Sequence, residues 1–182
     1  FDVGIAEGHG VTFAAGLATQ GVKPVVAIYS TFLQRAYDNI VHDVALQDLP
    51  VVFCLDRAGI AGEDGPTHHG ALDIPYMLAV QGMTVTAPKD GAEMLSLIRL
   101  ATKMSDGPWC VRWPRDAVPA EVPDLKEIAP IEAHTWEVVR EGSDCAILAV
   151  GSMVLPALEA ANLLEREGVK TTVVNCRFLK PY

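Results

Sequence analysis

Short apolar runs rich in β-branched residues alternate along the chain with longer segments of helical period. Four of these runs lack a strict alternation of polar and apolar positions, which is typical of strands buried on both faces. They are Val22–Tyr29, Pro50–Arg57, Thr84–Pro88 and Pro108–Pro114. Together with the helical segments between them, they predict an α/β fold in which a parallel sheet is sandwiched by helices.

Three segments have the apolar spacing of helices that pack on such a sheet. Apolar residues recur three and four positions apart in Thr31–Gln47 and again in Asp90–Ser105, where the side chain of Asp90 is expected to cap the helix. A third helix over Gly8–Thr19 is expected to end at Gly21, because glycine commonly follows the last residue of a helix.

The segment from Arg115 to Ala133 has neither period. It contains scattered acidic residues and prolines, among them Pro119, Pro123 and Pro130, and we therefore predict a linker. The predicted organisation is a first domain at 1–116, a linker at 117–134 and the truncated start of a second α/β domain at 135–182. The strands and the helix expected in this second domain are Trp136–Arg140, Cys145–Val150, Pro156–Glu167 and Thr171–Phe178.

The composition narrows the class of protein. Half of the 182 residues are hydrophobic and 20% are charged, which excludes a disordered chain. With 14 basic and 23 acidic residues the formal net charge is −9, and so acidic a chain is a poor general binder of nucleic acid or of an anionic membrane. We expect neither as a partner, and a few well-placed arginines have to meet any bound phosphate.

The cysteines and the chain ends suggest where the protein works. No CxxC spacing occurs, and the cysteines lie in apolar, strand-like runs, so we expect reduced, buried thiols in a cytoplasmic protein. Pro156 interrupts the most apolar stretch, which argues against a membrane span. The chain starts at Phe1 and stops abruptly, so we expect a piece of a larger protein. The cysteines are Cys54, Cys110, Cys145 and Cys176.

Two groups of candidate residues lie in the first third of the chain. Glu7 stands between glycines at the start of the first predicted helix. It either stabilises the helix N-terminus through the helix dipole or is a buried carboxylate that shares a proton with a nitrogen heterocycle. Tyr29, Phe32 and Arg35 follow a predicted strand, where Phe32 can stack on a planar ring and Arg35 can pair with an anion. A core phenylalanine and a solvated arginine are the alternative.

A long glycine-rich loop follows the second predicted strand. It begins at Arg57 and carries Asp64, His68 and His69. Loops at the carboxyl edge of an open α/β sheet commonly bind ligands. A metal site formed by Asp64 and both histidines is conceivable, but adjacent histidines cannot easily face one ion.

Arg112 and Arg115 end the fourth predicted strand. Arginines at this place suit a phosphate, and a surface pair beside the linker is the alternative. Because the carboxyl ends of parallel strands meet at one edge, we expect all four groups to lie there. The chain lacks a GxGxxG motif after a strand, which disfavours a dinucleotide site and a dehydrogenase.

The segments that carry these groups resemble the 1-deoxy-D-xylulose-5-phosphate synthase family of transketolase-like enzymes. The resemblance covers nearly the whole chain. It implies that 1–116 is a transketolase-like pyrimidine-binding domain and that 135–182 begins a transketolase C-terminal domain. The similar segments are Asp2–Glu7, Val11–Gly16, Pro24–Asp38, His42–Leu46, Asp56–Gly59 and Asp64–Gly70.

The resemblance implies an activity and its cofactors. The family joins pyruvate, with loss of carbon dioxide, to D-glyceraldehyde 3-phosphate, using thiamine diphosphate and Mg²⁺, for isoprenoid, thiamine and pyridoxal biosynthesis. Family members hold the diphosphate and magnesium in an N-terminal domain, through a Gly-Asp-Gly motif and an Asn that nothing here matches. The implied partners are therefore this missing N-terminal domain and, in a homodimer, a second copy; the chain alone is expected to be inactive.

The resemblance also implies roles for single residues. Glu7 resembles the carboxylate that hydrogen-bonds the pyrimidine ring of the cofactor and favours its imino tautomer. Phe32 resembles the aromatic residue against that ring, and His68 is implied to be catalytic together with Glu7. No residue of this chain is expected to bind the metal. The implied substrate-binding residues are Tyr29, Arg35, Arg57, Asp64, His68 and Arg115.

One departure from the family pattern and two alternatives remain. The family commonly has Glu-Gln-His-Ala where this chain has Glu7-Gly8-His9-Gly10, so we expect a looser first helical turn. One alternative is another transketolase-like thiamine enzyme, including one with split subunits, which the loop Asp64–Gly70 disfavours. A non-catalytic partner of the same fold is the other alternative, and it would not need the carboxylate of Glu7.

Overall fold

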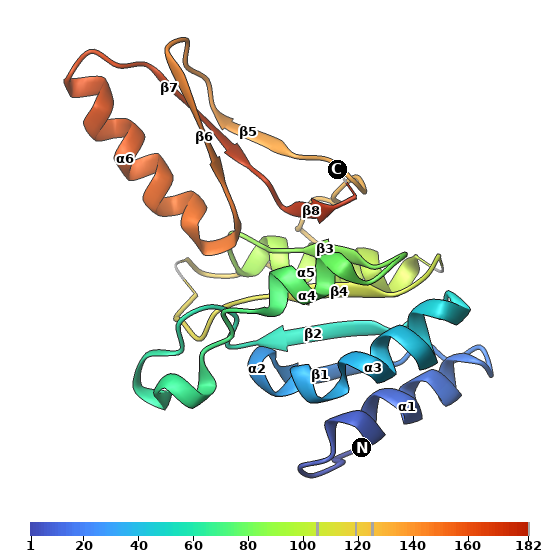
Figure 1. Cartoon of the computed structure of the whole chain (residues 1–182). Helices are drawn as coiled ribbons and strands as arrows, with labels where there is room; N and C mark the ends of the chain where they lie inside the picture. The colour runs from blue at the N-terminus through green and yellow to red at the C-terminus, as the bar shows by residue number, and fades with distance from the viewer. Residues whose placement is uncertain (105, 119, 125, 182) are drawn as a thin grey trace.

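The computed structural model describes residues 1–104, 106–118, 120–124 and 126–181. It contains a five-stranded and a three-stranded sheet, as Figure 1 shows. In the larger sheet four strands are parallel, as predicted, and a fifth is added antiparallel at one edge, so the sheet is mixed. Its order is β1 (Val25–Tyr29), β2 (Val52–Asp56), β4 (Trp109–Arg112), β3 (Thr84–Thr86) and β8 (Phe178–Lys180).

Helices cover both faces of the larger sheet because successive residues of a strand point to opposite faces. Phe53 and Leu55 belong to the core that α1, α4 and the helical stretch 30–47 share on one face. Val52 and Cys54 belong to the core under α5 on the other face. This two-sided burial explains why the strand lacks polar positions. The helices are α1 (Glu7–Ala18), α4 (Asp73–Ala79) and α5 (Gly91–Lys103).

The helical stretch 30–47 is not one regular α-helix. Its apolar residues face the core as the spacing predicts, but the hydrogen-bond pattern changes several times along it. Irregular turns of this kind are frequent where a helix meets a functional site. The pieces are α2 (Ser30–Leu33), a 3₁₀ turn (Gln34–Ala36), α3 (Tyr37–Asn39), a π-helical turn (Ile40–Val44) and a second 3₁₀ turn (Ala45–Gln47).

Two other helix predictions concern α5 and α1. The carboxylate of Asp90 accepts a hydrogen bond from the backbone N–H of Glu93 at 2.8 Å, so the predicted cap of α5 is confirmed. The predicted end of this helix, Ser105, lies outside the described residues. In α1, Gly8 and Gly10 are part of the regular helix, and a Cβ at Gly8 would lie 2.9 Å from Asn39 Oδ1. The close contact with Asn39 is a packing reason for glycine at this position.

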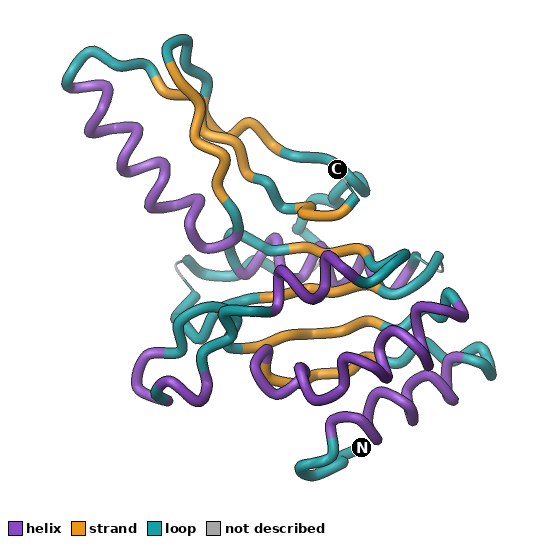
Figure 2. Tube along the Cα trace, viewed as in Figure 1, coloured by secondary structure: helices purple, strands orange, loops and turns teal. Residues whose placement is uncertain are grey.

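The smaller sheet has the order β5, β7, β6, and one helix, α6, packs on it. The described part of 113–136 contains no helix or strand and runs along α5 (Figure 2), where Ser96 Oγ donates to the carbonyl of Ala129 at 2.8 Å. Pro119 of the predicted linker lies outside the described residues. No helix in the described ranges is both long and apolar enough to cross a membrane. The bounds are β5 (Glu137–Arg140), β6 (Cys145–Ala149), β7 (Thr171–Asn175) and α6 (Val154–Arg166).

The structure corrects two expectations about the second unit. The predicted strand Thr171–Phe178 is wrong as a single strand, because β7 stays in the smaller sheet while β8 pairs with β3 of the larger one. The expectation that all four cysteines are buried is wrong for Cys145, which is exposed at the start of β6. The other three cysteines are buried.

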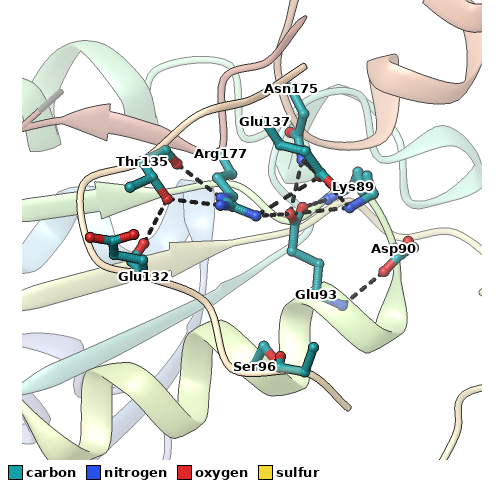
Figure 3. Close-up of polar contacts among 10 residues, drawn as sticks. Lys89, Asp90, Glu93, Ser96, Glu132, Thr135, Glu137, Asn175 and Arg177 are labelled. Atoms are coloured by element: carbon teal, nitrogen blue, oxygen red, sulfur yellow. Dashed lines mark hydrogen bonds and ion pairs between the residues drawn. The ribbon is translucent and has the colours of Figure 1, made fainter. Parts of the chain in front are cut away.

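A buried polar cluster joins the two units (Figure 3). The side chain of Glu93, 3% exposed, accepts from the backbone N–H of Lys89 at 2.7 Å and from Asn175 Nδ2 at 2.8 Å, and Arg177 lies 3.5 Å away. Lys89 Nζ also donates to Glu137 at 2.9 Å. Burial by itself would raise the pKa of Glu137, but hydrogen bonds from Lys89 and Asn175 and the charges of Lys89 and Arg177 outweigh it and lower this pKa. Two cations thus balance two carboxylates at the junction.

Candidate functional site

The candidate residues meet at the carboxyl edge of the larger sheet. Tyr29 ends β1 and lies opposite Asp56, which ends β2. Arg57 follows β2 directly, and Arg115 follows the neighbouring strand β4. Since these strands are parallel, their carboxyl ends lie side by side, and the chain of contacts described next connects the candidate residues except His69 and Arg112.

At one end of this chain Glu7 pairs with Arg35. Glu7 begins α1 and is 9% exposed, and its Oε1 accepts a hydrogen bond from an Nη atom of Arg35 at 2.9 Å. The guanidinium carbon of Arg35 lies 5.0 Å from the centre of the Phe32 ring. Glu7 therefore has the helix-end position that a dipole role requires, and also a cationic partner that such a role does not require.

Three aromatic rings form the middle of the site. The rings of Tyr29 and Phe32 are stacked with centres 5.6 Å apart. His68 comes from the glycine-rich loop and packs edge-on against Phe32 at 5.2 Å, with Tyr29 at 6.4 Å. The loop and the turn after β1 are thus held together by ring contacts, and Phe32 has a cation on one side and an imidazole beside it.

At the other end Asp64 joins two arginines. Its Oδ2 accepts from Arg57 Nε at 2.6 Å and lies 3.4 Å from Arg115 Nε. Arg57 also donates to Asp56 at 2.6 Å and lies over the Tyr29 ring at 3.8 Å. The hydrogen bond from Arg57, aided by the charge of Arg115, lowers the pKa of Asp64. A phosphate at this place has to share these arginines with Asp64 or displace it.

The loop that carries Asp64 and His68 is closed at its neck. Gly59 and Gly70 exchange two backbone hydrogen bonds, of 2.9 and 2.7 Å. A Cβ at Gly70 would lie 2.3 Å from Ser30 Oγ and 2.5 Å from the carbonyl oxygen of Arg57, so no other residue fits. Arg57 itself has φ +57°, a left-handed conformation that costs energy for a residue with a side chain. This tight neck sets where the loop leaves the sheet.

The histidine next to His68 does not face the site. His69 Nδ1 accepts a hydrogen bond from the backbone N–H of Ala61 at 3.0 Å, so its ring is turned into the loop. Within the described ranges no group of three or more His, Cys, Asp or Glu side chains is arranged to hold a metal ion. The pairing of His69 leaves the conceivable metal site of Asp64 and both histidines without its third ligand.

The helix α4, which was not predicted from the sequence, contacts the turn after β1 and the end of β4. Asp73, 2% exposed, accepts a hydrogen bond from Arg112 Nε at 2.7 Å. Arg112 therefore pairs inside the fold and, contrary to the expectation, is not available to bind a phosphate. The hydroxyl of Tyr76 donates to the carbonyl of Ser30 at 3.0 Å, and burial raises the pKa of Tyr76 so that it stays protonated. Pro75, which a helix tolerates in its first turn, was the available signal for α4.

A cavity of about 500 Å³ adjoins the arginine end of the site. Asp56 and Arg115 line it on one side, and Met94, Trp113 and Leu155 supply apolar walls from α5, the segment after β4 and α6. The cavity therefore lies where both units meet, beside the buried polar cluster. It leaves open space next to Arg115.

The arrangement fits two kinds of ligand group. A buried carboxylate beside an aromatic ring suits a planar nitrogen heterocycle, because the carboxylate can accept its N–H and the ring can stack on its face. Two convergent arginines suit a phosphate, since each guanidinium offers a fork of N–H donors. The two ends are bridged by Tyr29 and His68, which face the space between them.

Two family models match this chain. Residues 1–121 match the transketolase pyrimidine-binding domain, and residues 134–182 match the transketolase C-terminal domain. A 1-deoxy-D-xylulose-5-phosphate synthase of Geobacter sulfurreducens is 55% identical over 181 residues, and one of Aquifex aeolicus is 54% identical over 184 residues. Both alignments cover 100% of this chain and 28% of the relative, so the chain spans little more than a quarter of either protein.

Solved structures share the fold. A split-gene transketolase, described as an inactive beta4 tetramer, has a TM-score of 0.87 and 34% identity, over 100% of this chain and 58% of that one. A transketolase of Pichia stipitis in complex with sedoheptulose-7-phosphate has a TM-score of 0.84 over 97% of this chain and 26% of that one. At 24% identity this second likeness shows the fold alone.

Proposed function

Because this chain belongs to the transketolase family, we propose that it is the pyrimidine-binding domain and the start of the C-terminal domain of a 1-deoxy-D-xylulose-5-phosphate synthase. The domain limits in this proposal are 1–116, a linker at 117–134, and 135–182. One observation carries it: the unbroken line of contacts from Glu7 to Arg115, which joins a site for a heterocycle to a site for a phosphate. Relatives with this activity match the whole chain.

At the heterocycle end, Glu7 and Phe32 hold the pyrimidine ring of thiamine diphosphate. When bound, this cofactor supplies a nucleophilic carbon and an electron sink for decarboxylation. Glu7 accepts a hydrogen bond from a ring nitrogen and thereby fixes the proton there, while Phe32 stacks on the ring and excludes water from one face. The burial of Glu7 keeps that hydrogen bond away from competing solvent, and Phe32 is itself partly buried.

At the phosphate end, Arg57 and Arg115 bind the phosphate of D-glyceraldehyde 3-phosphate. Asp64, which joins these arginines, and His68, which lies between the two ends, face the reacting carbons, and His68 moves protons to and from oxygen atoms there. Tyr29 supports Arg57 through its ring and borders the substrate with it. Arg35 is the remaining substrate contact, and it faces pyruvate once Glu7 is engaged with the cofactor.

The remaining parts of the proposal lie outside this chain. The diphosphate and Mg²⁺ are held by an N-terminal domain of the same enzyme, which works as a homodimer in the cytoplasm. Among the described residues no cluster of metal ligands competes for this role.

The complete enzyme is expected to form 1-deoxy-D-xylulose 5-phosphate from pyruvate and D-glyceraldehyde 3-phosphate. The isolated 182-residue chain is expected to show neither tight cofactor binding nor turnover, because it lacks the diphosphate and metal ligands. Calorimetric titration with thiamine diphosphate and Mg²⁺, followed by a product assay, tests both statements. Faster reaction of the complete enzyme with ketose phosphate donors than with pyruvate would favour a transketolase. Turnover by the isolated chain would contradict the proposal that the diphosphate and metal ligands lie in another domain.

Substitution of Arg115 by alanine in the complete enzyme is expected to raise the KM for D-glyceraldehyde 3-phosphate roughly 10-fold or more. The KM for pyruvate, which has no phosphate, should change much less. Arg115→Lys keeps the charge but loses the fork of donors, so it should still weaken the contact. Arg166→Ala, at an exposed site on α6, serves as the control. An equal loss with unphosphorylated glyceraldehyde would mean that Arg115 only supports the fold.

A further inference from the structure

The guanidinium of Arg35 lies between the two groups that border the heterocycle site. It donates to Glu7 at 2.9 Å and lies 5.0 Å from the centre of the Phe32 ring. A guanidinium is planar, donates N–H hydrogen bonds to carboxylates and stacks on aromatic faces. An aminopyrimidine shares all three properties, so the same pair of protein groups suits either one.

We propose that Arg35 is an internal stand-in for the pyrimidine ring, which fills the place of the ring in the ligand-free chain and swings out when the ring binds. This inference rests on the proposed function, because it requires the ring site to be at Glu7 and Phe32. In the absence of the cofactor, Arg35 then occupies the ring site beside Glu7 and Phe32. The cofactor then competes with a residue of the protein and not only with water.

The side chain of Arg35 can move without the backbone. It is 57% exposed, whereas the side chain of its partner Glu7 is 11% exposed. Leu33, the last residue of α2, and Ala36, in the same 3₁₀ turn as Arg35, hold the backbone in place, since both are fully buried in the core. An exposed long side chain on a fixed turn exchanges rotamers quickly, so displacement costs little more than the two contacts it loses.

Loss of these contacts sets the size of the expected effect. The ion pair is half-exposed and the contact with Phe32 is a cation–π interaction, and together they are worth a factor of about 3 to 10 in an equilibrium constant. Arg35→Met keeps the length of the side chain but removes the charge and the donors. Thiamine diphosphate with Mg²⁺ should therefore bind to the complete Arg35→Met enzyme about 3- to 10-fold more tightly than to the wild type.

Isothermal titration calorimetry of the complete enzyme measures this directly. Arg166→Met, at an exposed position of α6, makes the same change of net charge and should leave the affinity unchanged. Arg35→Lys, which keeps the charge but not the planar fork, should bind with intermediate affinity. Turnover by Arg35→Met should fall while the cofactor affinity rises, and a purely structural role of Arg35 would not produce these opposite changes.

Two failures of this experiment are distinguishable. Equal or weaker binding by Arg35→Met, with normal binding by the wild type and by Arg166→Met, would overturn the stand-in role alone. Absence of cofactor binding by every protein, including the wild type, would overturn the proposed function and this inference with it. A second readout uses NMR of the complete enzyme without cofactor, in which Glu7→Gln should speed the solvent exchange of the Arg35 guanidinium protons; unchanged exchange would overturn the inference.

Discussion

Substitution of Glu7 by glutamine in the complete enzyme is expected to lower kcat by roughly 10²–10⁴-fold, the usual contribution of a general acid–base group. Glutamine keeps the shape of the side chain and can still accept one hydrogen bond. It cannot hold the negative charge that favours a proton on the ring nitrogen. The fold should be unaffected, because Glu7 begins α1 at the edge of the core and its carboxylate contacts the half-exposed Arg35.

The exchange rate of the C2 proton of the cofactor, measured by quenched-flow NMR, separates the two roles of Glu7. A carboxylate that activates the cofactor has to slow this exchange when it is removed. Glu165→Gln is the matched control, since Glu165 is an exposed carboxylate of α6 that pairs with Arg140. Unslowed exchange in Glu7→Gln would leave Glu7 as a helix-end carboxylate that acts only through the helix dipole.

Substitution of Glu93 by alanine is expected to lower the free energy of unfolding by about 3–5 kcal/mol, the usual cost of removing one partner from a buried ion pair. Glu93 receives a backbone N–H from Lys89 and a side-chain N–H from Asn175, and Arg177 lies beside it. Alanine leaves the backbone N–H of Lys89 without this acceptor and removes an acceptor from Asn175 and a counter-charge from Arg177. Because they come from both units, the loss should loosen the docking of the second unit on the larger sheet.

Urea unfolding followed by circular dichroism measures the change in free energy, and limited proteolysis in the segment 113–136 measures the docking. Glu165→Ala is the control, because its ion pair with Arg140 is on the surface and should contribute less than about 1 kcal/mol. Glu93→Gln keeps one acceptor oxygen, so its loss of unfolding free energy should lie between those of Glu93→Ala and Glu165→Ala. A loss for Glu93→Ala no larger than for Glu165→Ala would show that the buried cluster does not hold the units together.

Local features of this protein followed from its sequence. The apolar runs predicted the parallel strands, because residues buried on both faces of a sheet leave no polar position to alternate. The spacing after Asp90 predicted the helix and its cap, because the capping side chain bonds a backbone N–H only three positions away. Most candidate residues were found because they follow strands, and Glu7 because it begins a helix between glycines. The contacts among them are observed, and their catalytic roles stay predictions.

Other features required the tertiary structure. Arg35 had no identified partner in the sequence, and its pairing with Glu7, 28 positions away, depends on how α1 packs beside the turn after β1. The sequence suggested Arg112 as a phosphate ligand, but in the structure it pairs with Asp73 of α4. The crossing of β8 to the larger sheet depends on which strand lies at its edge, and the exposure of Cys145 depends on how β6 is covered.

The physical reason is the range of the interactions. Hydrophobic period, capping and turn preference act between residues a few positions apart, so the sequence by itself determined most strands, most helices and the segments that carry the site. Ion pairs, ring contacts and edge pairing depend on distances between residues far apart in the chain. Many partners of the right charge were available to each arginine, and only the packing of helices on the sheet decided which of them Arg35, Arg57, Arg112 and Arg115 contact.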